Sequence, residues 1–524
     1  MKNDSSCVDI VKDIYGGISS PVKASFISCF VVGVVTHLYI LTNKITNWDD
    51  INCFYYSGQA DEAGRWFLPH AFEASSKYNN PMTHGMLAVF LFAVAAALIC
   101  EALKIKTVTG AVLIGAVLIG AVMITFPSMA SMMTFTFTVH CYGVSIVLAS
   151  LAAFFTIRYG RWGRIAGIVC LVLSTATYQM FYLVAVCILL LELVLSVFRA
   201  DDAENVRVYL NRGLRYLEVS VISIVSYVVI TKFGPWELGN YKGMSDMGNI
   251  SLTEIPEVLA RDFHRLLQFF VTDPPSYVNN FFRVINVIVV LLAAAVTVVL
   301  IRQKCGSKKK ILLTLVACFL LILTSGGIYI LAPQTQDAST IMIYPYIFLY
   351  IYVISVSECI GIRDGGAVRY AVPVLMAFVI YSGFLVTNGA YYRSKLALDR
   401  VSAFYNRIMV KVEEQKGYTY DQKLLVAGDY WPDPNVLSAC NLDGDKYADM
   451  EGVAIENGLF TSSTRENFLK YYLGIQGEHV TDDETKKVES SDEFRSMPSY
   501  PEDGCVKKID GVWVVKINDI DNDQ

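Results

Sequence analysis

The chain has 524 residues, of which 54% are hydrophobic and only 17% are charged, and its formal net charge is −5. Soluble globular proteins carry about 25% charged residues. This deficit excludes an ordinary soluble protein, and the absence of a basic excess argues against a nucleic-acid-binding protein. The composition therefore indicates a membrane protein that crosses the bilayer many times.

Long apolar runs occupy most of the chain before residue 391. A bilayer core requires about 20 apolar residues per helix. The run 165–198 is too long for one helix, and polar residues around Tyr178 and Gln179 interrupt it, so we predict two helices joined there by a tight turn. The sequence thus predicts an all-α polytopic bundle of about 11 transmembrane helices. The other predicted spans are 22–42, 84–103, 107–126, 132–157, 216–236, 281–301, 311–331, 341–360 and 370–390.

Basic residues predict the orientation of these spans, because Lys and Arg accumulate on the cytoplasmic side of a membrane. They are concentrated in alternate connectors, around residues 104–106, 158–164, 199–215, 302–310 and 363–369. The pattern predicts a cytoplasmic N-terminal segment, 1–21. With an odd number of spans, it also predicts an extracytoplasmic C-terminal part and two long outer loops, 43–83 and 233–280.

A smaller domain is predicted at 391–524, after the multi-span domain 22–390. Apolar residues in 398–412 recur at helical spacing, and "KLLVAGD" (423–429) is typical of a buried strand. In "CVKKIDGVWVVKIN" (505–518), two strand-like runs flank Asp510-Gly511, a strong hairpin signal. We therefore predict a small α/β domain. Its two cysteines, Cys440 and Cys505, could form a disulfide outside the cell, and the sequence leaves this open.

The third predicted span contains "GAVLIGAVLIGAV". Its pairs Ala111/Gly115 and Ala116/Gly120 have the small-xxx-small spacing that allows close approach of helices. This motif predicts helix packing and no chemistry.

Two adjacent acids, Asp49 and Asp50, follow Trp48 at the predicted outer end of the first span. A carboxylate near a low-dielectric boundary is costly unless it is used or paired. Partial desolvation raises its pKa, which suits a general base that deprotonates an incoming hydroxyl. The alternative is that both acids cap a surface helix or solvate the loop, and spacing alone does not exclude it.

The same loop continues with "AGRWFLP", residues 63–69. The guanidinium of Arg65 offers a planar fork suited to phosphate oxygens, and Trp66 offers an apolar face for a sugar ring. The alternative is an interfacial anchor. Tyr178 and Gln179, at the predicted tight turn, are candidates to face the outer cavity.

The second outer loop contains "IPEVLARDFHRLLQFF", which is typical of a helix lying on the membrane surface. Arg261, His264 and Arg265 share its polar side, and the two arginines form a second candidate phosphate site beside a sugar-contacting histidine. The alternative is a solvated helix face. The apolar residues at helical spacing are Ile255, Val258, Leu259, Phe263, Leu266, Leu267 and Phe270.

No Walker A, GxGxxG, HExxH or GxSxG motif occurs in a suitable context. An enzyme acting on the outer face has no access to cytoplasmic nucleotides, so a group that it transfers must come from a lipid-borne donor. The sequence requires no cofactor and leaves a divalent metal open.

The order "TN…NWDD…SGQADEAGRW", the "YQ" turn and the closing "SMPSYPEDGCVKKIDGVWVVKI" resemble the bacterial membrane glucosyltransferases of the serotype-conversion (Gtr) type. The resemblance implies a GT-C-like architecture. It also implies transfer of glucose from polyprenyl-phosphate-glucose to a surface polysaccharide on the outer face of the bacterial cell membrane, as in O-antigen modification. The family's acidic pair falls on Asp49 and Asp50, and its Gly-Arg-Trp on Gly64, Arg65 and Trp66. Asn47-Trp48 before the acids is a departure from the family pattern, and its effect on the acceptor is open.

The resulting hypothesis is a hexosyltransferase in which Asp49 or Asp50 is the base and Arg65, helped by Arg261 or Arg265, stabilises the departing phosphate. Its expected partners are the lipid-linked donor, the glycan acceptor, the bilayer, and the synthase and flippase that supply the donor. Two alternatives remain: a flippase for lipid-linked sugars, and a surface-polysaccharide polymerase or ligase.

Overall fold

The computed structural model describes residues 16–55, 63–73, 75–106, 114–200, 205–236, 253–331, 339–360, 366–428, 446–455 and 462–519. The chain forms two compact units. The first comprises Met1–Thr42 and Ser57–Asn388, and the second comprises Asn43–Tyr56 together with Gly389–Gln524. Part of the predicted first outer loop therefore belongs to the same unit as the C-terminal region.

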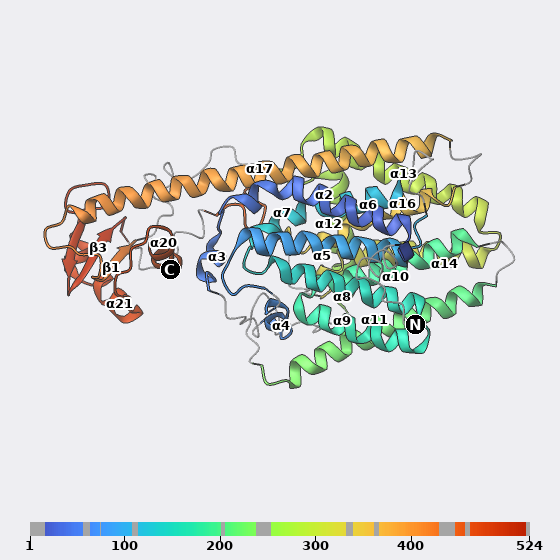
Figure 1. The fold of residues 1–524 in the computed structure, drawn as a ribbon, viewed down its shortest axis with the longest axis horizontal. Helices are drawn as coiled ribbons and strands as arrows, with labels where there is room; N and C mark the ends of the chain where they lie inside the picture. The colour runs from blue at the N-terminus through green and yellow to red at the C-terminus, as the bar shows by residue number, and fades with distance from the viewer. Residues whose placement is uncertain are drawn as a thin grey trace, which may run out of the picture. The chain divides into compact units, whose positions relative to one another are not determined.

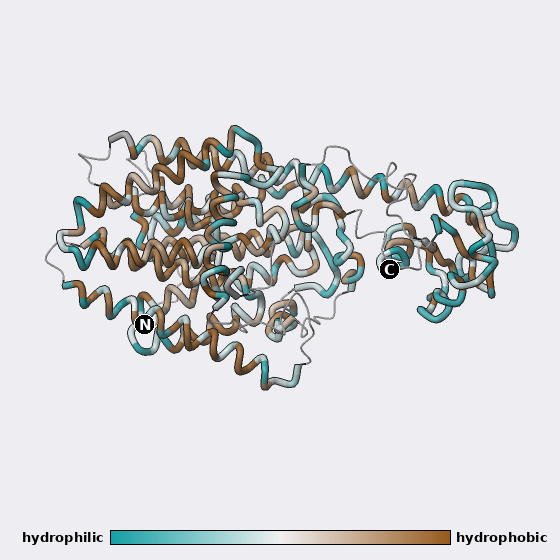
Figure 2. The backbone as a smooth tube through the Cα atoms, turned by 180° about the vertical axis from the view of Figure 1, so that it is seen from behind, coloured by the Kyte–Doolittle hydropathy of each residue, from teal (hydrophilic) through white to brown (hydrophobic). Residues whose placement is uncertain are grey.

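The first unit is a bundle of apolar helices (Figure 1). In the part of the chain that the structure describes, eight helices are long and apolar enough to cross a membrane, which supports a membrane protein. They are α2 (Ser20–Thr42), α5 (Pro81–Ala102), α8 (Val139–Arg158), α10 (Met180–Arg199), α11 (Val206–Phe233), α13 (Asn280–Lys304), α14 (Lys308–Gly326) and α17 (Gly366–Glu413), whose C-terminal part belongs to the second unit. Hydrophobic residues run along the helices of the bundle (Figure 2). Many of their side chains are exposed, as that of Leu291 on α13 is (63%). Outward apolar side chains suit a lipid surrounding.

Several shorter elements explain why fewer spans are found than the 11 predicted. Helices α6 (Gly115–Thr125) and α7 (Pro127–Thr134) form a pair bent by 46°, which gives a ninth candidate span if counted as one. Helix α9 (Arg161–Thr177) has 17 residues, and α16 (Phe348–Ser357), preceded by the 3₁₀ turn η4 (Tyr344–Ile347), has 10. The predicted span 132–157 is wrong as a single helix, because the chain breaks between α7 and α8. Thr134 there bonds back to the carbonyl of Ser131, and threonine is a poor helix former.

The predicted division of the run 165–198 is confirmed. Helix α9 ends at Thr177, and α10 begins at Met180, so that only Tyr178 and Gln179 lie between them. The described residues of the first unit also form four further short elements: α4 (Leu68–Phe72), α12 (Ile255–Leu267), the π-helical turn η3 (Gln268–Thr272) and α15 (Ile328–Leu331).

Close packing at Gly120 confirms the structural interpretation of the glycine repeat. Helices α2 and α6 contact each other, and a methyl group at position 120 would overlap the carbonyl oxygen of Ser25 and lie 3.0 Å from the backbone nitrogen of Cys29. Only glycine allows the two backbones to approach so closely. Ala111 of the other pair lies outside the described residues.

The second unit contains a three-stranded sheet in the order β1-β3-β2 (Figure 1). Strand β1 (Leu424–Ala427) pairs parallel to β3 (Val512–Lys516), and β2 (Val506–Ile509) pairs antiparallel to β3. Asp510 (φ 48°) and Gly511 (φ 89°) both have left-handed backbones, as a two-residue hairpin turn of the primed type requires. The predicted strand at 423–429 and the predicted hairpin are therefore confirmed. The helices α20 (Ser462–Tyr472), α21 (Asp482–Glu489) and α22 (Asp492–Arg495) accompany the sheet.

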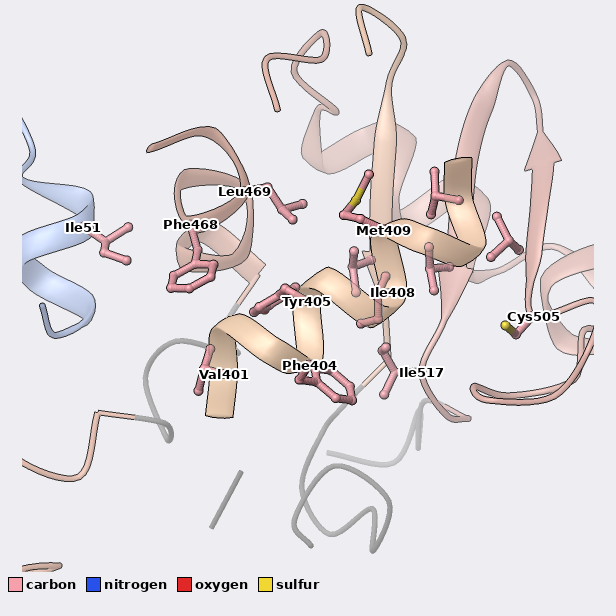
Figure 3. Packing of buried hydrophobic residues seen from close by; sticks show 14 of the residues in the cluster. Ile51, Val401, Phe404, Tyr405, Ile408, Met409, Phe468, Leu469, Cys505 and Ile517 are labelled. Atoms are coloured by element: carbon pink, nitrogen blue, oxygen red, sulfur yellow. The ribbon is translucent and has the colours of Figure 1, made fainter. Parts of the chain in front are cut away.

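The core of the second unit forms between the C-terminal part of α17 and the sheet (Figure 3). Val401, Phe404 and Ile408 of α17 are buried, as the spacing in 398–412 predicts. Cys505 is also buried in this core, whereas Cys440 lies outside the described residues, so their pairing stays a prediction.

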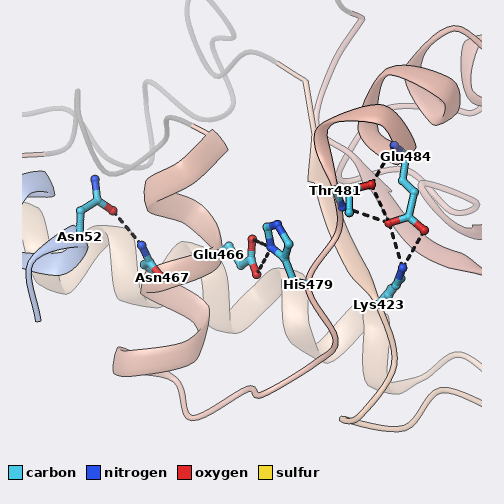
Figure 4. Close-up of polar contacts among 7 residues, drawn as sticks. All are labelled: Asn52, Lys423, Glu466, Asn467, His479, Thr481 and Glu484. Atoms are coloured by element: carbon cyan, nitrogen blue, oxygen red, sulfur yellow. Dashed lines mark hydrogen bonds and ion pairs between the residues drawn. The ribbon is translucent and has the colours of Figure 1, made fainter. Parts of the chain in front are cut away.

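A short helix from the first loop, α3 (Trp48–Asn52), is part of the same core. Ile51 is fully buried in the cluster. The amide of Asn467 on α20 donates to Oδ1 of Asn52 (2.9 Å, Figure 4), and Asn52 in turn contacts Thr464 (3.4 Å). Both apolar and polar contacts thus attach α3 to α20.

The packing at Gly120 gives a stability prediction. We expect Gly120→Ala to lower the free energy of unfolding by about 1–3 kcal/mol, because overpacking outweighs the better helix propensity of alanine. Thermal unfolding in detergent measures the change. Gly213→Ala in α11 is the matched control, since a methyl group there meets only the end of the Leu193 side chain at 3.3 Å. Equal stability of the two variants would contradict the packing argument.

Candidate functional site

The predicted site residues fall in both units. Trp48, Asp49 and Asp50 belong to the second unit, and the remaining candidates belong to the first. The candidates thus form two groups, one in each unit. The remaining candidates are Arg65, Trp66, Tyr178, Gln179, Arg261, His264 and Arg265.

The two acids lie in the first turn of α3. The cap of this helix is Asn47, whose side chain accepts a hydrogen bond from the backbone N–H of Asp50 (2.9 Å). Asp50 is 1% exposed, whereas Asp49 and Trp48 are half-buried. Asp49 is therefore the more accessible carboxylate of the pair. Asn47 thus has a local role that fits its position, because asparagine is a preferred N-cap residue.

Aromatic rings gather beside α3 in the second unit. Phe54 stacks on Tyr471 with ring centroids 4.6 Å apart, and the Lys44 ammonium lies 4.7 Å from the centroid of Phe54 and 4.4 Å from that of Tyr472. Tyr55 is 64% exposed. Aromatic faces, together with the nearby amides of Asn52 and Asn467, are groups that can contact sugar rings and hydroxyls.

In the first unit, the segment from Ala63 to Phe67 is bound to the break between α9 and α10. Gln179 is buried, and its amide donates to the carbonyl of Ala63 (2.7 Å) and to the hydroxyl of Tyr227 on α11 (3.1 Å). That hydroxyl donates to the carbonyl of Gly64 (3.1 Å), and the N–H of Phe67 donates to the carbonyl of Ala176 (3.0 Å). Gly64 has φ 68°, a left-handed conformation that favours glycine.

This attachment positions Arg65 and Trp66. Nε of Arg65 donates to Oε1 of Gln179 (3.3 Å), and the guanidinium carbon lies 4.3 Å from the ring centroid of Tyr178. Trp66 donates through Nε1 to Thr231 of α11 (3.1 Å) and stacks on Trp236 (5.3 Å). Four residues that the sequence offered as candidates, Arg65, Trp66, Tyr178 and Gln179, therefore form one connected site. A guanidinium held over an aromatic ring is suited to bind an anion such as a phosphate.

Helix α12 carries the second predicted phosphate site. Arg261 and Arg265 are half-buried and His264 is exposed. Nη1 of Arg265 donates to Oε1 of Gln268 (3.2 Å). Of the predicted apolar side, Val258 and Phe270 are buried, but Ile255 and Phe263 are 38% and 46% exposed. The apolar side of α12 is thus shared between the bundle interior and its surroundings.

Asp262 is a residue that the sequence analysis missed. It is 1% exposed, and its position, four residues after Val258 and four before Leu266, is the middle of the apolar stripe of α12. A carboxylate at that register was the available signal, because an acid on an apolar helix face near a membrane is rarely without a role. No motif and no neighbouring acid marks it in the sequence.

Comparison with known proteins assigns the family. The model of the family described as glucosyl transferase GtrII matches residues 38–356. The chain belongs to the GtrII glucosyl transferase family. The matched GtrII region contains α3, the Arg65 site and α12, and it ends before α17. No curated protein matches the chain, and no solved structure does. Membership of the GtrII family supports a glycosyltransferase that moves glucose.

No cluster of three or more His, Cys, Asp or Glu side chains that could hold a metal ion occurs among the residues that the structure describes. The dependence of this GtrII protein on a divalent metal therefore stays open, as it does from sequence.

The hydrogen bonds of Tyr227 give a prediction about the Arg65 site. Tyr227→Phe removes a hydroxyl that donates to the Gly64 carbonyl and accepts from the Gln179 amide. We expect the free energy of unfolding to fall by about 1–3 kcal/mol, because both groups lose this hydrogen bond. Hydrogen–deuterium exchange of the segment 63–73 should accelerate, and activity should fall. The control is Tyr381→Phe, whose ring is 54% exposed. Unchanged exchange in Tyr227→Phe would show that the bond does not hold the segment.

Proposed function

We propose that this GtrII protein transfers glucose, or a related hexose, from a polyprenyl-phosphate-sugar donor to a surface polysaccharide or lipid-linked glycan. The reaction takes place on the outer face of the bacterial cell membrane. The N-terminus is cytoplasmic and the second unit is extracytoplasmic. The proposal rests on the family match, on the apolar helices and on the distribution of Lys and Arg in the connectors.

The observation that carries the proposal is the way Arg65 is held. Its guanidinium combines a hydrogen bond to a buried amide with the face of Tyr178, at the end of two apolar helices. The planar fork of a guanidinium suits anions that carry several oxygens. The phosphate of a membrane-borne donor is such an anion, and Trp66 beside it offers an aromatic face to the sugar or lipid.

In the proposed reaction, Asp49 or Asp50 takes the proton of an acceptor hydroxyl. The acceptor oxygen attacks the anomeric carbon, the bond between that carbon and the phosphate oxygen breaks, and its electron pair leaves with polyprenyl phosphate. Arg65, with Arg261 or Arg265, stabilises the charge that builds on the phosphate. Trp48, Trp66, Tyr178, Gln179 and His264 contact the sugars or position these groups.

A flippase for lipid-linked sugars is a second candidate, and one observation favours it. Transporters commonly contain broken helices near their binding site, and among the described residues α6 and α7 form such a pair, bent by 46°. Proteoliposomes that contain labelled polyprenyl-phosphate-glucose and purified surface polysaccharide separate the candidates. Label in polysaccharide supports a transferase, movement of donor alone supports a flippase, and consumption of pyrophosphate-linked oligosaccharide supports a polymerase or ligase.

The same assay tests the proposed roles. Arg65→Ala should lower the transfer rate about 100- to 1,000-fold, as loss of a transition-state charge partner does, while Arg207→Ala, at an exposed position, leaves it unchanged.

The Asp49→Asn, Asp50→Asn double variant should lower the transfer rate about 100-fold or more, with Asp503→Asn as the control. Of the single variants, Asp49→Asn should have the larger effect on rate, because Asp49 is the more accessible. A double variant that inserts normally and retains full transfer removes the proposed base.

Accessibility of α3 tests the predicted outer location. The native Cys53 is a poor reporter, because burial and the neighbouring charges of Asp49 and Asp50 raise the pKa of its thiol to about 12. The exposed Tyr55 is a better position. We expect Tyr55→Cys to react with a membrane-impermeant maleimide in intact cells, beyond the labelling of the parent chain. Labelling of this peptide only after permeabilisation places α3 in the cytosol and contradicts the mechanism.

A further inference from the structure

Asp262 on α12 is a buried carboxylate to which the proposed mechanism gives no role. Neither of its oxygens has a hydrogen-bond partner among the described residues, although the side chain is 1% exposed. Burying a carboxylate without a partner is costly, and folded proteins seldom do so for structure alone. Such a group is a candidate for contact with a ligand.

The surroundings of Asp262 leave room for its oxygens at the end of α14. A methyl group at position 326 would overlap Oδ1 of Asp262, so Gly326 provides the space that the carboxylate occupies. Helix α12 contacts both α14 and α15 there. The bundle is therefore shaped to accept an acid at this position.

A second polar group without a partner lies in the same neighbourhood. The hydroxyl of Tyr346, in η4, is buried and has no hydrogen-bond partner among the described residues. The ring of Tyr346 packs against Phe269 and Phe270 of η3, directly after α12, with centroids 5.2 and 5.8 Å apart, and the charges of Asp262 and Arg265 act on its hydroxyl. The charge of Asp262 also acts on Cys187 of α10. One turn of α12 thus presents a carboxylate and a guanidinium close to an unsatisfied hydroxyl.

These groups match the two ends of a sugar phosphate. A carboxylate accepts hydrogen bonds only, and two neighbouring sugar hydroxyls can supply two donors to it. The tyrosine hydroxyl can donate to a further sugar oxygen, while Arg265 and Arg261 carry the charge that a phosphate needs. The π-helical turn η3, which follows α12 directly, is of a kind often found at functional sites.

We propose that Asp262, together with Tyr346, binds hydroxyl groups of the donor hexose, and that Arg261 and Arg265 hold the adjoining phosphate. This inference rests on the proposed function and assigns the donor headgroup to the inner side of α12. Asp262 thereby determines that the enzyme prefers a sugar-bearing lipid to the bare polyprenyl phosphate.

Donor binding tests the assignment without an acceptor. The purified protein in nanodiscs is titrated with polyprenyl-phosphate-glucose and, separately, with polyprenyl phosphate. The wild type should bind the glucosylated lipid more tightly, and Asp262→Asn should reduce that preference about 10- to 100-fold while binding of the bare lipid changes little. Donors that lack one hydroxyl each identify the contact: for one of them, the wild type and Asp262→Asn should bind equally. Asp273→Asn, an exposed acid just after η3, is the control.

Thermal stability distinguishes a ligand-binding role of Asp262 from a structural role. A structural role would make Asp262→Asn less stable than the wild type, whereas a ligand-binding role would not. Burial raises the pKa of the Asp262 carboxyl to about 7. Because this value exceeds that of the unfolded chain, Asp262 opposes folding increasingly as the pH rises from about 4 to about 7. Its described neighbours Cys187, Arg265 and Tyr346 do not reverse this direction. Asp262→Asn should therefore be at least as heat-stable as the wild type, with a larger gain at about pH 8 than at about pH 5.

A second variant moves the carboxylate without removing its charge. Gly326→Ala should displace Asp262 and produce the same donor-specific loss, whereas Gly213→Ala should not. Two outcomes overturn the inference. In the first, Asp262→Asn keeps the wild-type preference for the glucosylated lipid. In the second, Asp262→Asn is less stable than the wild type and binds both lipids equally less well. Failure of the proposed function can be distinguished from these outcomes, because the wild type would then transfer sugar to no glycan.

Discussion

The amide of Gln179 is the contact on which the Arg65 site depends. Inside a membrane protein, a break between two helices exposes backbone groups that no water can satisfy, so another part of the chain must supply partners. The segment from Ala63 to Phe67 does so through the Phe67 N–H, which donates to the Ala176 carbonyl, and the carbonyl of Ala63 accepts in return from the side-chain amide of Gln179. The same contacts set the position of Arg65. The contacts that supply hydrogen-bond partners at the break therefore also place the guanidinium of Arg65.

Tyr227 extends this network to a third helix. Its hydroxyl connects Gln179 to the Gly64 carbonyl, while Thr231, one turn further along α11, accepts from Trp66. Helix α11 thus contributes a polar edge to the site and an exposed apolar surface elsewhere, as Leu217 (59% exposed) shows. A helix that divides its faces in this way is consistent with contact with lipid on one side and with a polar headgroup site on the other.

The sequence predicted local features of this protein better than their assembly. The interruption at Tyr178 and Gln179 was visible because polar residues divide an apolar run, and the hairpin at Asp510-Gly511 because its turn chemistry is specific. The separate candidates Arg65 and Gln179 could not be joined from sequence, because their contact spans more than a hundred residues and depends on rotamers of a buried amide. Nor could the attachment of α3 to α20, since Ile51 and Asn52 are ordinary loop residues until the C-terminal unit packs against them.

Asp262 shows why hydrophobic periodicity needs a different interpretation beside a membrane. In a soluble protein, the apolar stripe of a helix faces the core, and an acid within that stripe is a defect. On α12 the apolar stripe also meets surroundings outside the bundle, as the exposed Phe263 indicates, and its centre faces inward. The inward-facing position, occupied by Asp262, can then hold a polar group that contacts a ligand. A helix lying at this boundary can hold a lipid-borne substrate only if it offers polar contacts inward and apolar contacts outward, and the placement of Asp262 and Phe263 one residue apart satisfies both demands.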